Sequence, residues 1–76
     1  LGKYEESNII SNKIIRAQLQ YGRIGEIHYN LFNIAWNKNE VSHNKKAYID
    51  SLYQCMLCSQ MCNDGYFENR YRARMT

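Results

Sequence analysis

The chain has 76 residues, of which 45% are hydrophobic, and a formal net charge of +3 at pH 7. A chain of this length forms one small domain with a marginal core, and it has no apolar run near the roughly 20 residues that a membrane span needs. The positive charge is scattered apart from three arginines near the C-terminus, so it does not indicate a nucleic-acid-binding surface, which usually carries a denser basic stripe.

The first expected helix covers about residues 3–20. Its apolar stripe, which we expect to face the core, consists of Ile10, Ile14, Ala17 and Tyr21 and is widened by Ile9, Ile15 and Leu19. Gly22 then ends the helix, because glycine readily takes the left-handed conformation that a helix C-terminus often needs.

The second expected helix, about residues 24–38, has two distinct faces. The apolar face carries Ile27, Leu31, Ile34 and Ala35, and the polar face carries Glu26, Asn30, Asn33 and Asn37, with Tyr29 and Trp36 at its edges. Each asparagine costs roughly 0.5 kcal/mol relative to alanine in a helix interior, because its side chain competes for backbone hydrogen bonds. A hydrogen-bonding groove is one explanation of this stripe, and the base composition of an AT-rich genome is the other.

Two further helices are expected. Residues 39–44 read as a polar connector in which Ser42 or Asn44 caps the next helix. That helix, about residues 45–62, is apolar around most of its circumference, so we expect it to lie buried between neighbours. Asp64 is a natural N-cap for a last helix, about residues 66–75. Part of its stripe of Phe67, Tyr71 and Met75 should stay exposed and mark a missing neighbour or a partner.

The chain also repeats itself. Gly25 and Gly65 lie 40 positions apart, and each follows a long amphipathic helix and opens another helix. Repeats of roughly 34 to 40 residues are typical of helical-hairpin arrays. We therefore expect an all-α fold: an antiparallel helical-hairpin array of about four helices in a single domain that spans residues 1–76.

Several stretches point to one family. The chain opens with LGKYEES, residues 25–35 read GEIHYNLFNIA, and Lys13-Ile14-Ile15 and Tyr48, Ser51 and Leu52 fall in between and after. The opening stretch resembles the LG-x-YEEA turn of tetratricopeptide repeats, and residues 25–35 resemble their GEA-x-x-NLG-x-IY helix. Lys13-Ile14-Ile15 falls where those repeats carry K-A-L. Tyr48, Ser51 and Leu52 resemble their Y-x-x-A-L. The longer-period forms are most similar, including those of bacterial regulators that sense peptide pheromones. Phe32 departs from the pattern where the repeats carry a small glycine.

The resemblance implies a binding groove. In tetratricopeptide repeats the first helix of each pair lines a concave surface. In this register the groove residues are Glu26, Tyr29, Asn30, Asn33, Trp36 and Asn37, extended by symmetry to Asn69 and Arg72. An asparagine side chain both donates and accepts hydrogen bonds, so it can bind the backbone of an extended peptide.

The cysteines are the main candidates for chemistry. Cys55, Cys58 and Cys62 share one helical face, but a zinc or iron–sulfur site usually needs four ligands from two segments. Only His28 and His43 could complete such a site, so we expect the thiols to act as small hydrophobic groups and expect no metal and no cofactor. Neither histidine has a nearby nucleophile or carboxylate partner in the sequence, so we expect no enzymatic activity.

These observations predict a binding module. The preferred hypothesis is part of the C-terminal repeat domain of a bacterial transcriptional regulator, excerpted from a longer protein and cytoplasmic, as its free thiols suggest. The expected partner is a short peptide or protein segment, with homodimer formation through the exposed C-terminal helix as a second mode. No direct contact with nucleic acid and no contact with a membrane are expected. The alternative is a purely structural scaffold or oligomerisation domain.

Overall fold

The computed structural model describes residues 2–76. Within this range the chain forms helices and no strand: α1 (Lys3–Gln20), the 3-10 turn η1 (Gly25–Ile27), α2 (His28–Ser42), α3 (Lys45–Met61) and α4 (Gly65–Met75). The expected all-α array of four helices is therefore confirmed. No helix of the described range is both long enough and apolar enough to cross a membrane.

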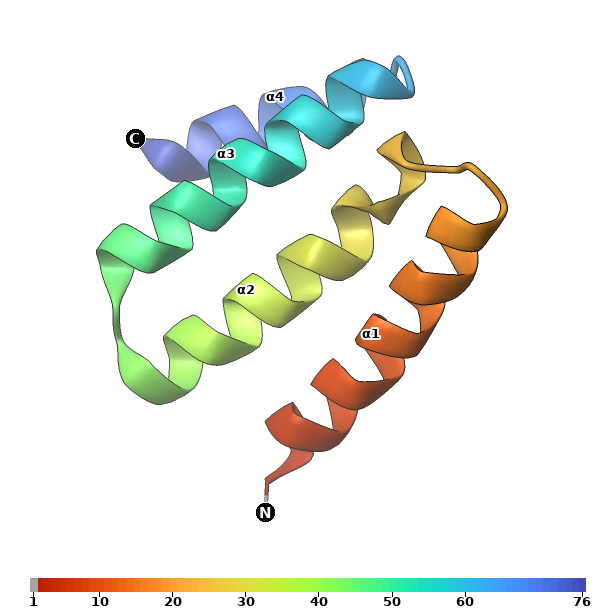
Figure 1. Ribbon diagram of the computed structural model, residues 1–76. Coiled ribbons are helices and arrows are strands. Elements are labelled where there is room, and N and C mark those ends of the chain that lie inside the picture. The colour runs from red at the N-terminus through yellow and green to blue at the C-terminus, as the bar shows by residue number, and fades with distance from the viewer. Residues whose placement is uncertain (1) are drawn as a thin grey trace.

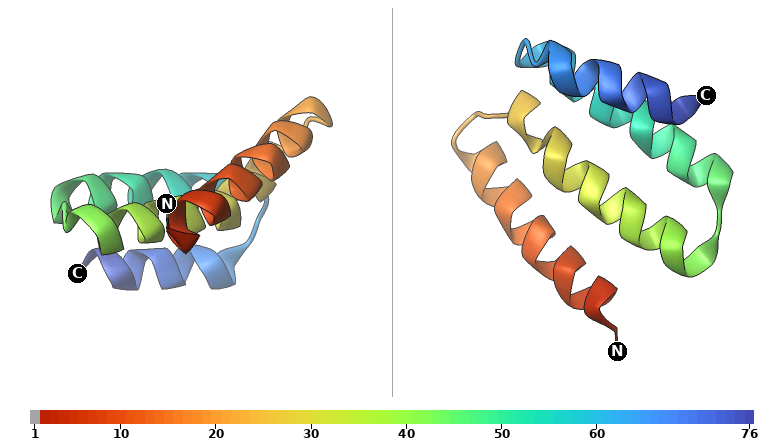
Figure 2. Two further views of the ribbon diagram at one scale, coloured as in Figure 1. Left: turned by 90° about the horizontal axis from the view of Figure 1, so that it is seen from below. Right: turned by 180° about the vertical axis from the view of Figure 1, so that it is seen from behind.

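Successive helices run antiparallel. α1, α2 and α3 lie side by side in Figure 1, and α4 lies behind α3, as the views from below and behind also show (Figure 2). Among the described residues, α3 contacts α2, η1 and α4, whereas α1 contacts only α2 and η1. The molecule measures 34 × 31 × 15 Å, so it is a slab between one and two helix diameters thick.

The core is centred on α3. Leu52, Cys55 and Met56 of α3 are buried together with Tyr71 of α4. Partly buried side chains of α2, α3 and α4 pack against this cluster, namely Leu31, Phe32, Tyr48, Leu57, Phe67 and Met75. The prediction that α3 lies between neighbours is confirmed. Of the stripe on α4, Tyr71 is buried in this core, whereas Phe67 and Met75 pack against it and stay partly exposed.

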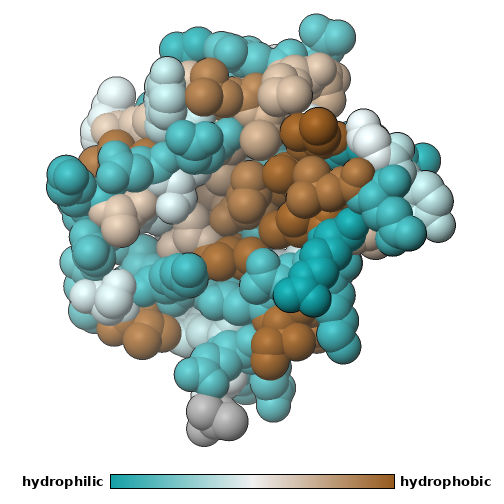
Figure 3. Space-filling model, viewed as in Figure 1, coloured by the Kyte–Doolittle hydropathy of each residue, from teal (hydrophilic) through white to brown (hydrophobic). Residues whose placement is uncertain are grey.

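α1 packs differently from the expectation. Its buried residues are Ser11 and Ile15, whereas Ile9 and Ile10 are 58% and 59% exposed and Ile14 is also exposed. The predicted apolar stripe of α1 therefore faces mostly outward, and apolar surface is visible in Figure 3 where α1 and α2 lie side by side. The reason is that α2 meets α1 with asparagines rather than with its apolar face, so the hydroxyl-bearing side of α1 is the complementary one.

The helix ends follow from local chemistry. Gly22 has a φ of 74° after α1, as expected for a glycine at a helix C-terminus. The side chains of Asn44 and Asp64 accept hydrogen bonds from Ala47 N and Phe67 N, and so cap α3 and α4 as predicted. The expected connector over residues 39–44 is wrong in its extent. Residues 39–42 continue α2, and only His43, in the left-handed conformation, and Asn44 connect it to α3.

Gly25 is the point of closest approach between two segments. A Cβ placed at Gly25 would lie 2.8 Å from both the Cβ and the backbone N of Cys62, and 3.0 Å from the carbonyl oxygen of Cys58. Two of these atoms belong to the backbone of the C-terminal end of α3, so they cannot move aside cheaply. Gly65, its counterpart in the 40-residue repeat, would place a Cβ in open space.

We predict that Gly25→Ala lowers the free energy of unfolding by about 1–3 kcal/mol, the usual cost of overpacking. The matched variant Gly65→Ala should leave stability unchanged or raise it by up to about 1 kcal/mol, because alanine is the better helix former. Urea unfolding followed by circular dichroism measures both. Equal effects of the two substitutions would contradict the close approach at Gly25.

Candidate functional site

Side chains of α2 and α4 line an open groove between these two helices. Its volume is about 360 Å³, and its walls are almost entirely aromatic or cationic. We call it the aromatic–arginine groove, lined by Tyr29, Phe32, Tyr66, Phe67, Arg70, Tyr71 and Arg74, with Trp36 adjoining it. Tyr29, Phe32 and Trp36 reach it together because they are spaced i, i+3 and i+7 along α2.

The aromatic walls hold one another in place. Phe32 of α2 packs against Tyr71 of α4 at a centroid separation of 5.5 Å and against Trp36 at 6.3 Å. At the other end of the groove, Tyr29 meets Phe67 of α4 edge-on at 6.0 Å. Such tilted and edge-to-face pairs are favourable arrangements of aromatic rings. They bridge α2 and α4, and so give the groove rigid walls.

Two guanidinium groups lie on these rings. Arg74 lies 5.0 Å from the centroid of Phe32 and 5.4 Å from that of Trp36. Arg70 lies 5.5 Å from the centroid of Tyr66 and donates a hydrogen bond to the Tyr66 hydroxyl at 3.0 Å. Cation–π contacts position the guanidinium groups without neutralising their charge. Within residues 2–76 neither arginine forms an ion pair, so the groove presents two available positive charges.

The structure places two predicted groove residues in or beside this groove. Tyr29 is 56% exposed and Trp36 is 38% exposed, and both face the α4 side. Arg72, in contrast, pairs with Glu68 at 2.9 Å on another face of α4. The carboxylate of Glu68 also accepts a hydrogen bond from Gln60, and these contacts lower its pKa, with the Gln60 bond as the largest cause.

The predicted asparagines occupy a different interface. The side-chain amide of Asn33 donates to the hydroxyls of Ser7 and Ser11 at 3.2 and 3.1 Å, and that of Asn37 donates to Asn8 at 3.0 Å. All three acceptors lie on α1. The amides of Asn33 and Asn37 therefore join α1 to α2.

The remaining predicted residues are dispersed. Glu26 is exposed on η1 and pairs with Arg23 at 3.5 Å, Asn30 is half-buried on α2, and Asn69 is exposed on α4. Sequence reasoning missed Phe32, Tyr66, Arg70 and Arg74 as groove residues. Two helical stripes in the sequence could have indicated these residues. One is the aromatic stripe of α2, and the other is Tyr66, Arg70 and Arg74 at i, i+4 and i+8 on α4.

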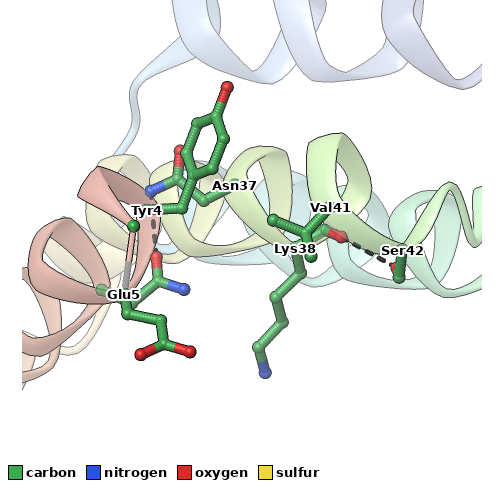
Figure 4. Close-up of a pocket in the computed structure, with 8 residues that line it drawn as sticks. Tyr4, Glu5, Asn37, Lys38, Val41 and Ser42 are labelled. Atoms are coloured by element: carbon green, nitrogen blue, oxygen red, sulfur yellow. Dashed lines mark hydrogen bonds between the residues drawn. The ribbon is translucent and has the colours of Figure 1, made fainter.

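A second hollow, of about 450 Å³, lies where α1 begins and α2 ends. Figure 4 shows Tyr4 beside the Asn37 amide there, with Lys38, Val41 and Ser42 further along α2. The dashed line from the Asn37 amide marks its bond to Asn8, which closes the inner side of this hollow. Two of its polar groups are already paired, the Asn37 amide with Asn8 and the Ser42 hydroxyl with the carbonyl oxygen of Lys38.

A buried histidine network supports the start of α2. His28 is 6% exposed, its Nδ1 shares a 2.8 Å hydrogen bond with the Tyr71 hydroxyl, and its Nε2 lies 3.2 Å from Oδ2 of Asp64. Burial is the largest cause that raises the pKa of the Tyr71 hydroxyl above its ordinary value of 10.0. Cys62 completes the only group of metal-ligating side chains found among the described residues, with His28 and Asp64.

The three cysteines have different environments. Cys55 is fully buried in the core, and burial raises its pKa from 9.0 to about 12. Burial, followed by the neighbouring Cys62, also raises the pKa of the partly buried Cys58. The expectation that the thiols act as small hydrophobic groups therefore describes Cys55 well. Cys62, in contrast, is partly exposed and lies beside the polar side chains of His28 and Asp64. His43 is exposed in the turn between α2 and α3.

No protein-family model, curated protein or solved structure matches this chain. The function of the chain is therefore inferred from the aromatic–arginine groove and from the cluster of His28, Cys62 and Asp64.

We predict that the protein loses stability in alkaline solution because of Cys55 and Tyr71. Their raised pKa values mean that the folded state binds these protons more tightly than the unfolded chain does. The stabilisation from Cys55 is fully present below its unfolded pKa of 9.0 and is lost as the pH rises through about 12.

Urea unfolding between pH 7 and about pH 11, in the presence of a phosphine reductant, measures this effect. The free energy of unfolding should fall from about pH 9 upward. The variant Cys55→Ala should be less stable at pH 7, because of the cavity, but should decline less steeply. A flat profile up to about pH 11 would contradict the burial of these two groups.

Proposed function

We propose that the aromatic–arginine groove binds a short acidic peptide or an acidic segment of a partner protein. The observation that supports this most strongly is that Arg70 and Arg74 lie on aromatic rings in an open groove without a carboxylate partner among the described residues. A monomer gains little from two cations in this arrangement unless an anion pairs with them, because an exposed cation–π contact contributes only about 0.5–1 kcal/mol.

The chemistry of the groove selects its ligand. A guanidinium can pair with a carboxylate through two parallel hydrogen bonds, and such charge-assisted bonds are roughly twice as strong as neutral ones. Tyr29, Phe32 and Trp36 offer flat apolar surfaces to side chains between the acidic residues. A volume of about 360 Å³ lies at the lower end of ligand pockets, so it accommodates one or two side chains rather than a whole folded partner.

The asparagines contribute in two ways under this proposal. Asn69 is exposed on the same helix as the two groove arginines, where its amide is free to meet a peptide backbone. Asn33 and Asn37 act at a distance, because their bonds to α1 fix the helix that carries the aromatic wall. Membership of a tetratricopeptide-like array and a role in a cytoplasmic transcriptional regulator stay predictions from the resemblance.

A scaffold or oligomerisation domain is the second candidate. It is favoured by the exposed Ile9, Ile10 and Ile14 on α1, since apolar residues of this size at the surface mark contacts with other helices. A scaffold does not require free guanidinium groups in the groove. The two candidates therefore differ in what the groove arginines do.

Trp36 is the single tryptophan and reports on the groove directly. We predict a saturable change of its fluorescence on titration with a hexapeptide that alternates glutamate with phenylalanine, and a much weaker response to the matched glutamine peptide. Arg74→Gln and Arg70→Gln should each weaken binding about tenfold, or about 1.4 kcal/mol, and added salt should weaken it further.

Arg72→Gln is the matched control, because Arg72 lies on the same helix but pairs with Glu68 outside the groove. It should bind the peptide as the unmodified protein does. No saturable response, or equal loss in all three arginine variants, would reject the groove and favour the scaffold.

A further inference from the structure

We propose that His28, Cys62 and Asp64 form a binding site for Zn²⁺ at the turn from α3 to α4. The three side chains come from separate places in the chain: the first residue of α2, the C-cap of α3 and the N-cap of α4. Their ligand atoms all lie within 4.8 Å of one another. Imidazole, thiolate and carboxylate are the three ligand types that zinc uses in proteins.

The distances between the ligand atoms are close to or somewhat longer than those in a zinc site. Nε2 of His28 and Oδ2 of Asp64 are 3.2 Å apart, close to the roughly 3.3 Å edge of a tetrahedron with Zn–N and Zn–O bonds of about 2.0–2.1 Å. With a Zn–S bond of about 2.3 Å, the thiolate should lie about 3.6 Å from the other two ligands. Because the ligand atoms lie within 4.8 Å of one another, the Cys62 sulfur needs to move by at most about 1.2 Å, which a partly exposed side chain at the end of a helix can do.

Two of the three ligands, Asp64 and His28, are already oriented by a second contact. Oδ1 of Asp64 caps α4 by accepting from Phe67 N, which leaves Oδ2 free to face His28. Nδ1 of His28 is bonded to the Tyr71 hydroxyl, so Nε2 is the nitrogen that faces the site. Partners of this kind, which fix the tautomer and direction of a ligand, are typical of metal-binding histidines.

The site is open on one side. A hollow of about 500 Å³ leads to it and is lined by Glu26, Asn63, Gly65 and Tyr66 as well as the three ligands. An ion can enter from solvent through this hollow, and a water molecule can take the fourth position. Glu26 is exposed at the rim, where its carboxylate is paired with Arg23 at 3.5 Å.

The protons balance in a single step. In the empty site Nε2 of His28 lies 3.2 Å from Oδ2 of Asp64, and Nδ1 lies 2.8 Å from the Tyr71 hydroxyl. In the occupied site Nε2 gives its lone pair to the ion and the ring proton is on Nδ1, where it is donated to the Tyr71 oxygen, while the Tyr71 hydroxyl keeps its own proton and turns it away from the ring. The Cys62 thiol gives one proton to solvent and binds as a thiolate, so one proton is released per ion.

Cobalt(II) tests the site, because it takes the place of zinc and its spectrum reports on thiolate ligation and tetrahedral geometry. Titration of the reduced protein with Co²⁺ alone should give a thiolate-to-metal charge-transfer band and intense visible bands that saturate at one ion per chain. Zn²⁺ should abolish both bands by displacement. A wild-type protein with no saturable spectrum would overturn the proposal.

Variants assign the ligands. Cys62→Ser should remove the charge-transfer band, and Asp64→Asn, which keeps the N-cap, should weaken binding at least tenfold. Tyr71→Phe removes only the hydroxyl behind His28 and should weaken binding about 10-fold or more, as loss of such a partner usually does. Circular dichroism of each variant establishes that it is folded.

Cys58→Ser and His43→Asn are the matched controls, because they change the same residue types outside the cluster, and asparagine tolerates the left-handed conformation at position 43. Both should keep the full spectrum. A spectrum that survives in Cys62→Ser, or one that is lost in Cys58→Ser, would reject this ligand set. The arginine variants of the groove should bind Co²⁺ normally, so the metal-site proposal and the peptide-binding proposal are tested independently.

Discussion

The absence of a side chain at Gly25 lets η1 approach the backbone at the C-terminal end of α3, and much of the molecule depends on this approach. Because η1 runs directly into α2, the contact decides where α2 begins. It brings His28, the first residue of α2, against Asp64 and Tyr71, so that one imidazole connects α2, the turn after α3 and α4. The same approach places Cys62 beside that imidazole.

α2 then meets a different neighbour on each of three sides. Its asparagines bond to hydroxyl and amide groups of α1, its Leu31 packs against the core around α3, and its aromatic residues reach α4. One helix therefore serves as polar interface, core element and groove wall. The groove is a direct result, since Phe32, which packs against Tyr71 of α4, is also a ring on which Arg74 lies.

The sequence was sufficient to predict the helices, because long periodic segments with glycine or capping residues at their ends leave few alternatives. It failed where two local signals conflicted. Asn39, Val41 and Ser42 are only moderate helix formers, yet α2 continues through them, since His43 takes the left-handed conformation that ends a helix and leaves room for a two-residue turn. The face of α1 was also predicted wrongly, because an apolar stripe reveals that a helix is amphipathic but not which of its sides meets a polar neighbour.

The sites were predictable only in part, for the same reason. Tyr29 and Trp36 were recognised as edges of a groove, but Arg70 and Arg74 became visible only once α4 was placed next to α2. The cluster of His28, Cys62 and Asp64 brings together residues up to 36 positions apart. The spacing of the cysteines pointed instead to a shared helical face, which places Cys55 in the core and only Cys62 beside the histidine.

The three hydrogen bonds by which Asn33 and Asn37 hold α1 have a consequence for alignment. Apolar helix faces tolerate sliding, because one methyl group replaces another at little cost. An amide matched to a particular hydroxyl does not, since a shift by a single residue rotates the acceptor by about 100° around the helix axis and leaves the donor without a partner. These bonds therefore fix the register of α1 along α2, although they add little to the stability of the interface.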